Sequence, residues 1–84
     1  MNTIVRDITI VNVWFDSQRI YIETSVGDIK SDLLEKYPRL FNASEEERNG
    51  FEISPLGIHW EAIDEDLSLD GFYHARSMEN YKSE

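Results

Sequence analysis

Cysteine is absent from this 84-residue sequence. That absence excludes disulfide bridges, and it excludes a thiolate that would bind a metal or attack a substrate. Histidine is scarce as well, with two residues and no spacing of the H-E-x-x-H kind. The four glycines are scattered singly and form no phosphate-binding loop. We therefore expect no metal and no cofactor.

The sequence also has few basic residues: it contains eight Lys and Arg residues and seventeen Asp and Glu residues, which gives a net charge of -9. The imbalance lies in residues 43–84, where eleven acids and three bases leave -8; residues 1–42 hold six acids and five bases. Such charge repels phosphate backbones and attracts basic proteins, although solubility alone would also explain it. We expect no nucleic-acid binding and consider a small basic protein the candidate partner, with a homodimer left open.

Long apolar runs are missing too, and the longest is far short of a membrane span. The sequence opens on Met1-Asn2-Thr3 without an apolar or arginine-rich leader. These features predict a soluble cytoplasmic protein that does not associate with membranes. A length of 84 residues is that of one small domain, which buries roughly 60% of the surface of its unfolded chain.

Three segments show the patterns of antiparallel strands joined by short turns: Ile4 to Phe15, Arg19 to Thr24 and Asp28 to Leu33. The first is apolar on both faces, which predicts a central strand covered on both sides. The second alternates, with Ile20 and Ile22 pointing inward. The third alternates as well, with Ile29 and Leu33 inward. Together they predict a three-stranded meander.

The pattern then changes to short helices across residues 34–49. Pro38 can open a helical turn, and Ser44-Glu45-Glu46-Glu47 has the form of a capping box. A second hairpin is predicted at Phe51–Trp60, turning at Pro55-Leu56-Gly57, with a short helix near Leu69 to His74. The predicted fold is therefore a single α+β domain over residues 1–74, followed by a polar, frayed tail at 75–84.

Several longer strings resemble a family of small bacterial proteins, the domain-of-unknown-function family numbered 2442. They read V-W-F-D-S-Q-R-I-Y-I (13–22), Y-P-R-L-F-N-A-S-E-E-E-R (37–48), E-I-S-P-L-G-I-H-W (52–60) and D-E-D-L-S-L-D-G (64–71). The resemblance implies a compact α+β domain. It also implies a paired, antitoxin-like role, because relatives are often encoded beside another small protein. It assigns no catalytic residue.

The candidate binding residues are one histidine and six acids in the second half of the chain: Glu45, Glu46, His59, Glu61, Asp64, Glu65 and Asp66. A histidine with carboxylates can hold a divalent metal or move a proton, but the sequence favours His59 as a structural residue of a short strand. The acidic run 64–66 departs from the calcium-loop pattern, and it is explained by a solvated turn or a helix start.

The large aromatic residues could form a stacking pocket, but a core this thin needs them for packing. They are Trp14, Phe15, Phe51, Trp60 and Phe72. Trp60 in particular is predicted to be core, since it follows Ile58 by two positions in a strand.

We therefore favour a small, acidic, non-enzymatic protein-interaction module, an antitoxin-like or regulatory partner of a neighbour-encoded small protein. The alternative is a small hydrolytic or metal-assisted enzyme that uses His59 and the nearby carboxylates. A third hypothesis is a ligand-sensing domain whose relatives regulate transcription through an added DNA-binding part.

Overall fold

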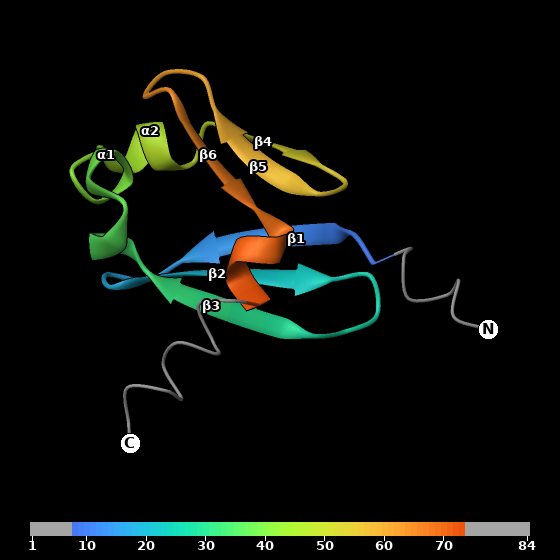
Figure 1. Cartoon of the computed structure of the whole chain (residues 1–84). Helices are drawn as coiled ribbons and strands as arrows, with labels where there is room; N and C mark the ends of the chain where they lie inside the picture. Colours follow the sequence, from blue (N-terminus) through green and yellow to red (C-terminus); the bar gives the residue numbers. More distant parts are fainter. Residues whose placement is uncertain (1–7, 74–84) are drawn as a thin grey trace.

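The computed structural model describes residues 8–73, which form two three-stranded antiparallel sheets with short helices between them (Figure 1). The strands are β1 (Ile10–Phe15), β2 (Arg19–Thr24), β3 (Ile29–Leu33), β4 (Phe51–Ser54), β5 (Gly57–Trp60) and β6 (Glu65–Ser68). The helices are the 3₁₀ turn η2 (Leu34–Lys36), α1 (Pro38–Phe41) and α2 (Glu45–Arg48). Residues 69–73 are helical. This architecture confirms the predicted α+β class.

The first sheet has the order β1-β2-β3 and is the predicted meander. Its central strand is β2, so the prediction that the first strand is central and covered on both sides is wrong. A β-bulge between Ile10 and Asn12 explains the misleading pattern. The extra residue shifts the alternation, so that Ile10 and Val13 are both buried while Val11 is exposed. Residues 4–7 of the predicted strand and the tail 75–84 lie outside the described residues.

The third strand faces the opposite way from the prediction. Its register pairs Ile20 with Asp32 and Ile22 with Lys30, and cross-strand partners share a face of a sheet. Asp32 therefore points into the core with 1% of its surface exposed, whereas Ile29 is 54% exposed on the other face. A buried acid is tolerated here because polar partners surround it, as described in the Discussion.

The second sheet has the order β4-β5-β6. The predicted hairpin at residues 51–60 is confirmed, but the acidic run continues into a third strand, so the interpretation of residues 65–66 as a turn or helix start is wrong. Leu67 of this strand is buried against the core and pairs with Ile58. The two backbones approach closely at Gly57, where an added Cβ would lie 2.8 Å from the carbonyl oxygen of Leu67. Glycine is needed at that position to let β6 pair.

The predicted helix signals are confirmed. Pro38 occupies the first turn of α1, and Ser44 and Glu47 form the capping box of α2 through Glu47 N to Ser44 Oγ (3.1 Å) and Ser44 N to Glu47 Oε1 (2.9 Å). The core lies between the sheets and the helices, and it is formed by Ile10, Val13, Ile20, Ile22, Leu34, Leu40, Ile58, Trp60, Leu67, Leu69 and Phe72. The placement of Trp60 in the core is thus confirmed.

Candidate functional site

The candidate acids lie at the surface on three elements. Glu45 and Glu46 are exposed in the first turn of α2, where carboxylates meet the free N–H groups of the helix. Glu61 and Asp64 are exposed in the turn that joins β5 to β6, and Asp66 is exposed on β6. Glu65 is half-buried, because its position pairs with that of the buried Trp60.

Two of these acids line separate hollows. Glu45 lines a hollow between α2 and the end of β1, beside Phe15 and Asp16. Asp66 lines a different, shallow hollow on the second sheet, beside Gly57 and Ser68. The two regions are joined through the core, where Trp60 Nε1 donates to the backbone oxygen of Arg48 at 2.8 Å. The candidate surface therefore consists of a helix part and a β6 part.

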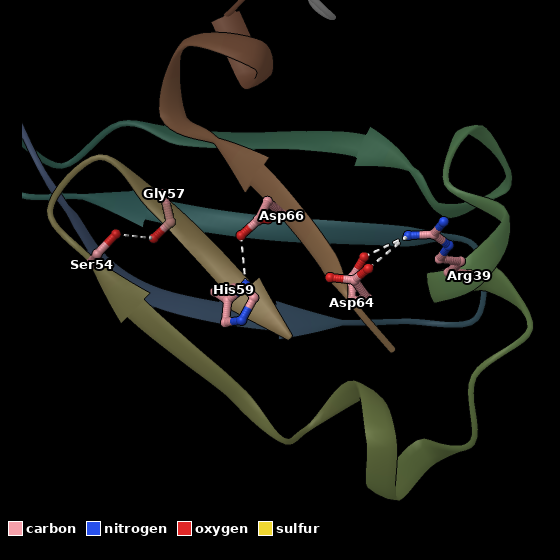
Figure 2. A network of polar contacts seen from close by, with 6 residues as sticks. All are labelled: Arg39, Ser54, Gly57, His59, Asp64 and Asp66. Carbon is pink, nitrogen blue, oxygen red and sulfur yellow. Dashed lines mark hydrogen bonds and ion pairs between the residues drawn. The ribbon is translucent and has the colours of Figure 1, made fainter. Parts of the chain in front are cut away.

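His59 and Asp66 are brought together by the pairing of β5 with β6, which makes them direct cross-strand partners (Figure 2). His59 Nδ1 lies 2.6 Å from Asp66 Oδ1. Glu52 of β4 is the partner of His59 on its other side. The three side chains form one row across the outer face of the second sheet, since paired residues share a face.

This row raises the pKa of His59 above its ordinary value of 6.5. The main cause is the hydrogen bond to Asp66, which favours the protonated ring. Partial burial lowers the pKa, and the negative charges of Asp66, Glu52 and Glu61 raise it further. Because the folded pKa exceeds the unfolded one, the pair stabilises the fold below the unfolded pKa. That contribution is lost as the pH rises through the folded pKa.

We predict that NMR titration of His59 gives a pKa above 6.5, and that Asp66→Asn lowers it toward that ordinary value. Glu52→Gln serves as the control, because it removes a charge from the same row while leaving the hydrogen bond in place; its effect should be smaller. Equal pKa values in the wild type and Asp66→Asn would show that the pair does not form in solution.

The chemistry of the pair is limited by its surroundings. The side chains of His59 and Asp66 are 42% and 74% exposed, so they lie on an open face rather than in a water-excluding cleft. The nearby hydroxyl of Ser54 donates to the carbonyl oxygen of Gly57 at 3.2 Å (Figure 2). Within residues 8–73, no group of three or more His, Cys, Asp or Glu side chains is arranged to hold a metal ion.

Asp64 is held by a residue that the sequence did not connect with it. Its φ of 54° is in the left-handed region, which Asp tolerates better than most residues. Arg39 of α1 donates from Nη1 to the backbone oxygen of Asp64 at 2.6 Å, and the same nitrogen lies 3.9 Å from Oδ2 (Figure 2). The 25-residue separation leaves no local signal for this contact. It fixes the turn that starts β6 and partly neutralises one of the candidate acids.

The aromatic residues divide into two groups. Phe15, Phe51 and Trp60 contact each other with ring centroids 6.3–6.5 Å apart, and Phe72 is buried, as predicted for core residues. Trp14 is different, because it is 37% exposed on the outer face of the first sheet, so its assignment to the core is wrong. The bulge in β1, which reverses the alternation, accounts for the difference.

Comparison with known proteins gives one match. The model of the family described as "Protein of unknown function (DUF2442)" covers residues 10–77. The chain belongs to this family. No curated protein and no solved structure matches. Among the described residues, no helix is long and apolar enough to cross a membrane.

Proposed function

We propose that this DUF2442 protein is a non-enzymatic interaction module that binds a small basic protein through the acids of β6, the preceding turn and α2. The observation that carries the proposal is the exposure of these carboxylates. Asp66 is paired with His59 and Asp64 with Arg39, whereas Glu45, Glu46 and Glu61 have no ion pair among the described residues. Exposed acids that are not engaged locally are available to a cationic partner.

The partner we propose is the small protein encoded next to this one, in an antitoxin-like or regulatory pair. Support for this step comes from the family, whose members are often encoded beside another small protein. The charge of the chain is consistent with it, since -8 of the net -9 resides in residues 43–84. An acidic rim would steer a basic partner and act mainly on the association rate.

Replacing Glu45, Glu46, Glu61 and Glu65 together by Gln tests the proposal, because it removes charge and preserves shape. We expect the fold to survive, since Glu45, Glu46 and Glu61 are exposed, Glu65 is half-buried, and solvated charges contribute little to stability. Binding to the neighbour-encoded protein should weaken at least tenfold at low salt, which is about 1.4 kcal/mol. Surface plasmon resonance over a range of ionic strengths would show a slower association rate and a shallower salt dependence.

Two further variants make the result specific. The pairs Glu45→Gln/Glu46→Gln and Glu61→Gln/Glu65→Gln separate the helix part from the β6 part. The control is Asp28→Asn/Glu35→Gln, which removes two charges elsewhere and keeps an oxygen that can accept from Tyr73 at 3.1 Å. The proposal fails if the neighbour does not bind, or if the quadruple variant and the control bind as tightly as the wild type.

The enzyme alternative has one supporting observation, the short contact between His59 Nδ1 and Asp66, which would orient the ring and leave Nε2 to exchange a proton. A hydrolytic activity lost in both His59→Ala and Asp66→Asn would favour it. So would a rise in melting temperature with millimolar Ca²⁺, Mg²⁺ or Mn²⁺ that His59→Ala abolishes.

A further inference from the structure

The outer edge of β1 is covered at one end and borders a hollow at the other. β1 is an outer strand of the first sheet, since the order is β1-β2-β3. At its start the second sheet covers it, because Ile10 N donates to the backbone oxygen of Pro55, just after β4, at 3.3 Å. Its last residues border the hollow beside α2, on the side of the molecule where the helices lie (Figure 1).

The register of the first hairpin shows which backbone groups this edge presents. Asp16 N donates to the backbone oxygen of Arg19 at 3.0 Å, and hydrogen-bonded pairs alternate along an antiparallel ladder. Trp14 is therefore hydrogen-bonded to Tyr21, whereas the N–H and C=O of Phe15 point away from β2. Within residues 8–73 neither of these two groups has a hydrogen-bond partner. An unpaired strand edge of this kind is a template for another chain.

The hollow runs along this edge. It has a volume of about 620 Å³, and one of its walls is formed by the consecutive residues 13–17. Successive side chains of a strand point to opposite faces, so a hollow on one face would be lined by alternate residues. A hollow lined by consecutive residues lies beside the backbone itself. Its volume falls within the range of ligand sites, roughly 300–1,000 Å³, so a short chain segment can enter it.

The opposite wall comes from α2 and the start of β4. Glu45, Arg48 and Asn49 line it, and their spacing of three and four residues places them on one side of the helical turn. Phe15 and Phe51, with ring centroids 6.3 Å apart, add apolar surface to the lining. The hollow thus combines unpaired strand groups with apolar side chains, as in sheet edges that bind an extended peptide.

The charges of the lining favour one cationic side chain in the occupant. Asp16 is engaged within the chain, since it accepts from the Tyr21 hydroxyl and two backbone N–H groups and lies near the charge of Arg19. Arg48 donates to two backbone oxygens of α1 at 3.1 and 2.8 Å. The carboxylate of Glu45 has no ion pair or hydrogen bond within residues 8–73. A cation would pair with Glu45, and repulsion from Arg48 disfavours a second one.

We propose that the basic protein binds here by adding an extended segment to the edge of β1 as a further strand. Backbone groups of the segment pair with the N–H and C=O of Phe15. An apolar side chain of the segment packs against Phe15 and Phe51, and one Lys or Arg side chain meets Glu45. This inference rests on the proposed function and gives the helix part of the candidate surface a defined contact. Main-chain bonds provide affinity and the side-chain contacts provide specificity.

Amide hydrogen exchange of the whole chain, free and saturated with the neighbour-encoded protein, measures the backbone pairing. The N–H of Phe15 has no acceptor within residues 8–73 of the free protein. Its exchange should slow by about tenfold or more in the complex, because a hydrogen-bonded amide exchanges only when its bond opens. The N–H of Trp14, which already bonds to β2, is the internal control and should change less.

Asn49→Trp tests the hollow without removing an acid. Asn49 is exposed and ends α2 with φ -82° and ψ -3°, a conformation that tryptophan also adopts, so its ring would fill the hollow. Binding to the neighbour-encoded protein should weaken at least tenfold, about 1.4 kcal/mol. Asn42→Trp is the matched control, because Asn42 is exposed at the end of α1 with φ -90° and ψ 0° and lies outside the lining. It should bind as the wild type does.

Should Asn49→Trp fail to fold by circular dichroism, Ser17→Trp replaces it, because Ser17 is an exposed residue of the other wall. Strand addition is overturned if the folded Trp variant of the hollow binds as tightly as the wild type. It is also overturned if the Phe15 amide exchanges as fast in the complex as in the free protein, as it would beside a bound helix. In both cases the proposed function survives, provided that the quadruple Glu-to-Gln variant binds more weakly. A neighbour-encoded protein that does not bind the wild type overturns both.

Discussion

Trp60→Ala is expected to lower the free energy of unfolding by about 3–5 kcal/mol, the range for truncating a buried aromatic residue. Trp60 has no exposed surface, and its ring contacts Phe15 from the first sheet and Phe51 from β4. Its indole N–H donates to the backbone oxygen of Arg48 at 2.8 Å. The residue thus joins the two sheets and the end of α2. Removing it opens a cavity in a domain that has one thin core.

Urea denaturation followed by circular dichroism measures this loss. Trp60→Phe separates the contributions, because it keeps much of the packing and leaves the carbonyl of Arg48 without its donor; we expect a cost of about 1–3 kcal/mol. Trp14→Ala is the control at an exposed site and should cost less than either. A loss below about 1 kcal/mol for Trp60→Ala would place the ring outside a packed core.

Local patterns predicted the elements whose signals lie within a few neighbouring residues. The capping box at residues 44–47 appears as Ser44 and Glu47 in both expected hydrogen bonds. The turn at Asp16 is another local motif, since Asp16 Oδ1 accepts from the backbone N–H groups of Gln18 and Arg19 at 2.8 Å. Such motifs are predictable because the interacting groups are adjacent in the chain.

The errors arose where a face or a partner is decided by pairing between strands. The bulge between Ile10 and Asn12 reverses the alternation of β1, and no glycine or proline marks it. The sixth strand has only four residues, two of them acids, and it forms because β5 supplies an edge and Gly57 permits a close approach. Neither the bulge in β1 nor the strand β6 can be recognised in a short window of sequence.

The candidate site also combines features that local sequence predicts with features that depend on strand pairing. Sequence placed His59 and Asp66 among the candidate residues, because histidine and carboxylate chemistry can be recognised by residue type. It could not show that these two form the contact while Glu45 lies beside a different hollow. That selection depends on the β5–β6 register, which only the three-dimensional structure supplies.

Asp32→Ala is the second variant with a large expected effect. Asp32 is buried, and its carboxylate accepts from the hydroxyl of Tyr37 at 2.5 Å and from the backbone N–H of Leu33 at 2.9 Å. Lys36 Nζ lies 3.0 Å from Oδ1, but its side chain is partly exposed and can return to water. The main cost of Asp32→Ala is therefore that the Tyr37 hydroxyl and the Leu33 N–H lose their hydrogen-bond acceptor. We expect the free energy of unfolding to fall by about 1–3 kcal/mol.

The pH dependence of stability provides an independent measure of this cluster. Burial raises the pKa of Tyr37 above its ordinary value of 10.0, and the hydrogen bond to Asp32 raises it further. A phenol whose pKa is higher in the folded state stabilises the fold while it is protonated. Stability should consequently fall as the pH rises above that ordinary value. Tyr37→Phe should reduce this alkaline loss, because it removes the titrating hydroxyl.

Controls distinguish the buried hydrogen bonds from the ion pair. Lys36→Gln removes the cation and should cost less than Asp32→Ala, since a partly exposed ion pair contributes little. Asp32→Asn keeps one oxygen and should fall between them. If Asp32→Ala and Lys36→Gln were equally close to the wild type in urea denaturation, the carboxylate would be hydrated rather than buried. The orientation of β3, which points Asp32 into the core and Ile29 to the opposite face of the first sheet, would then be incorrect.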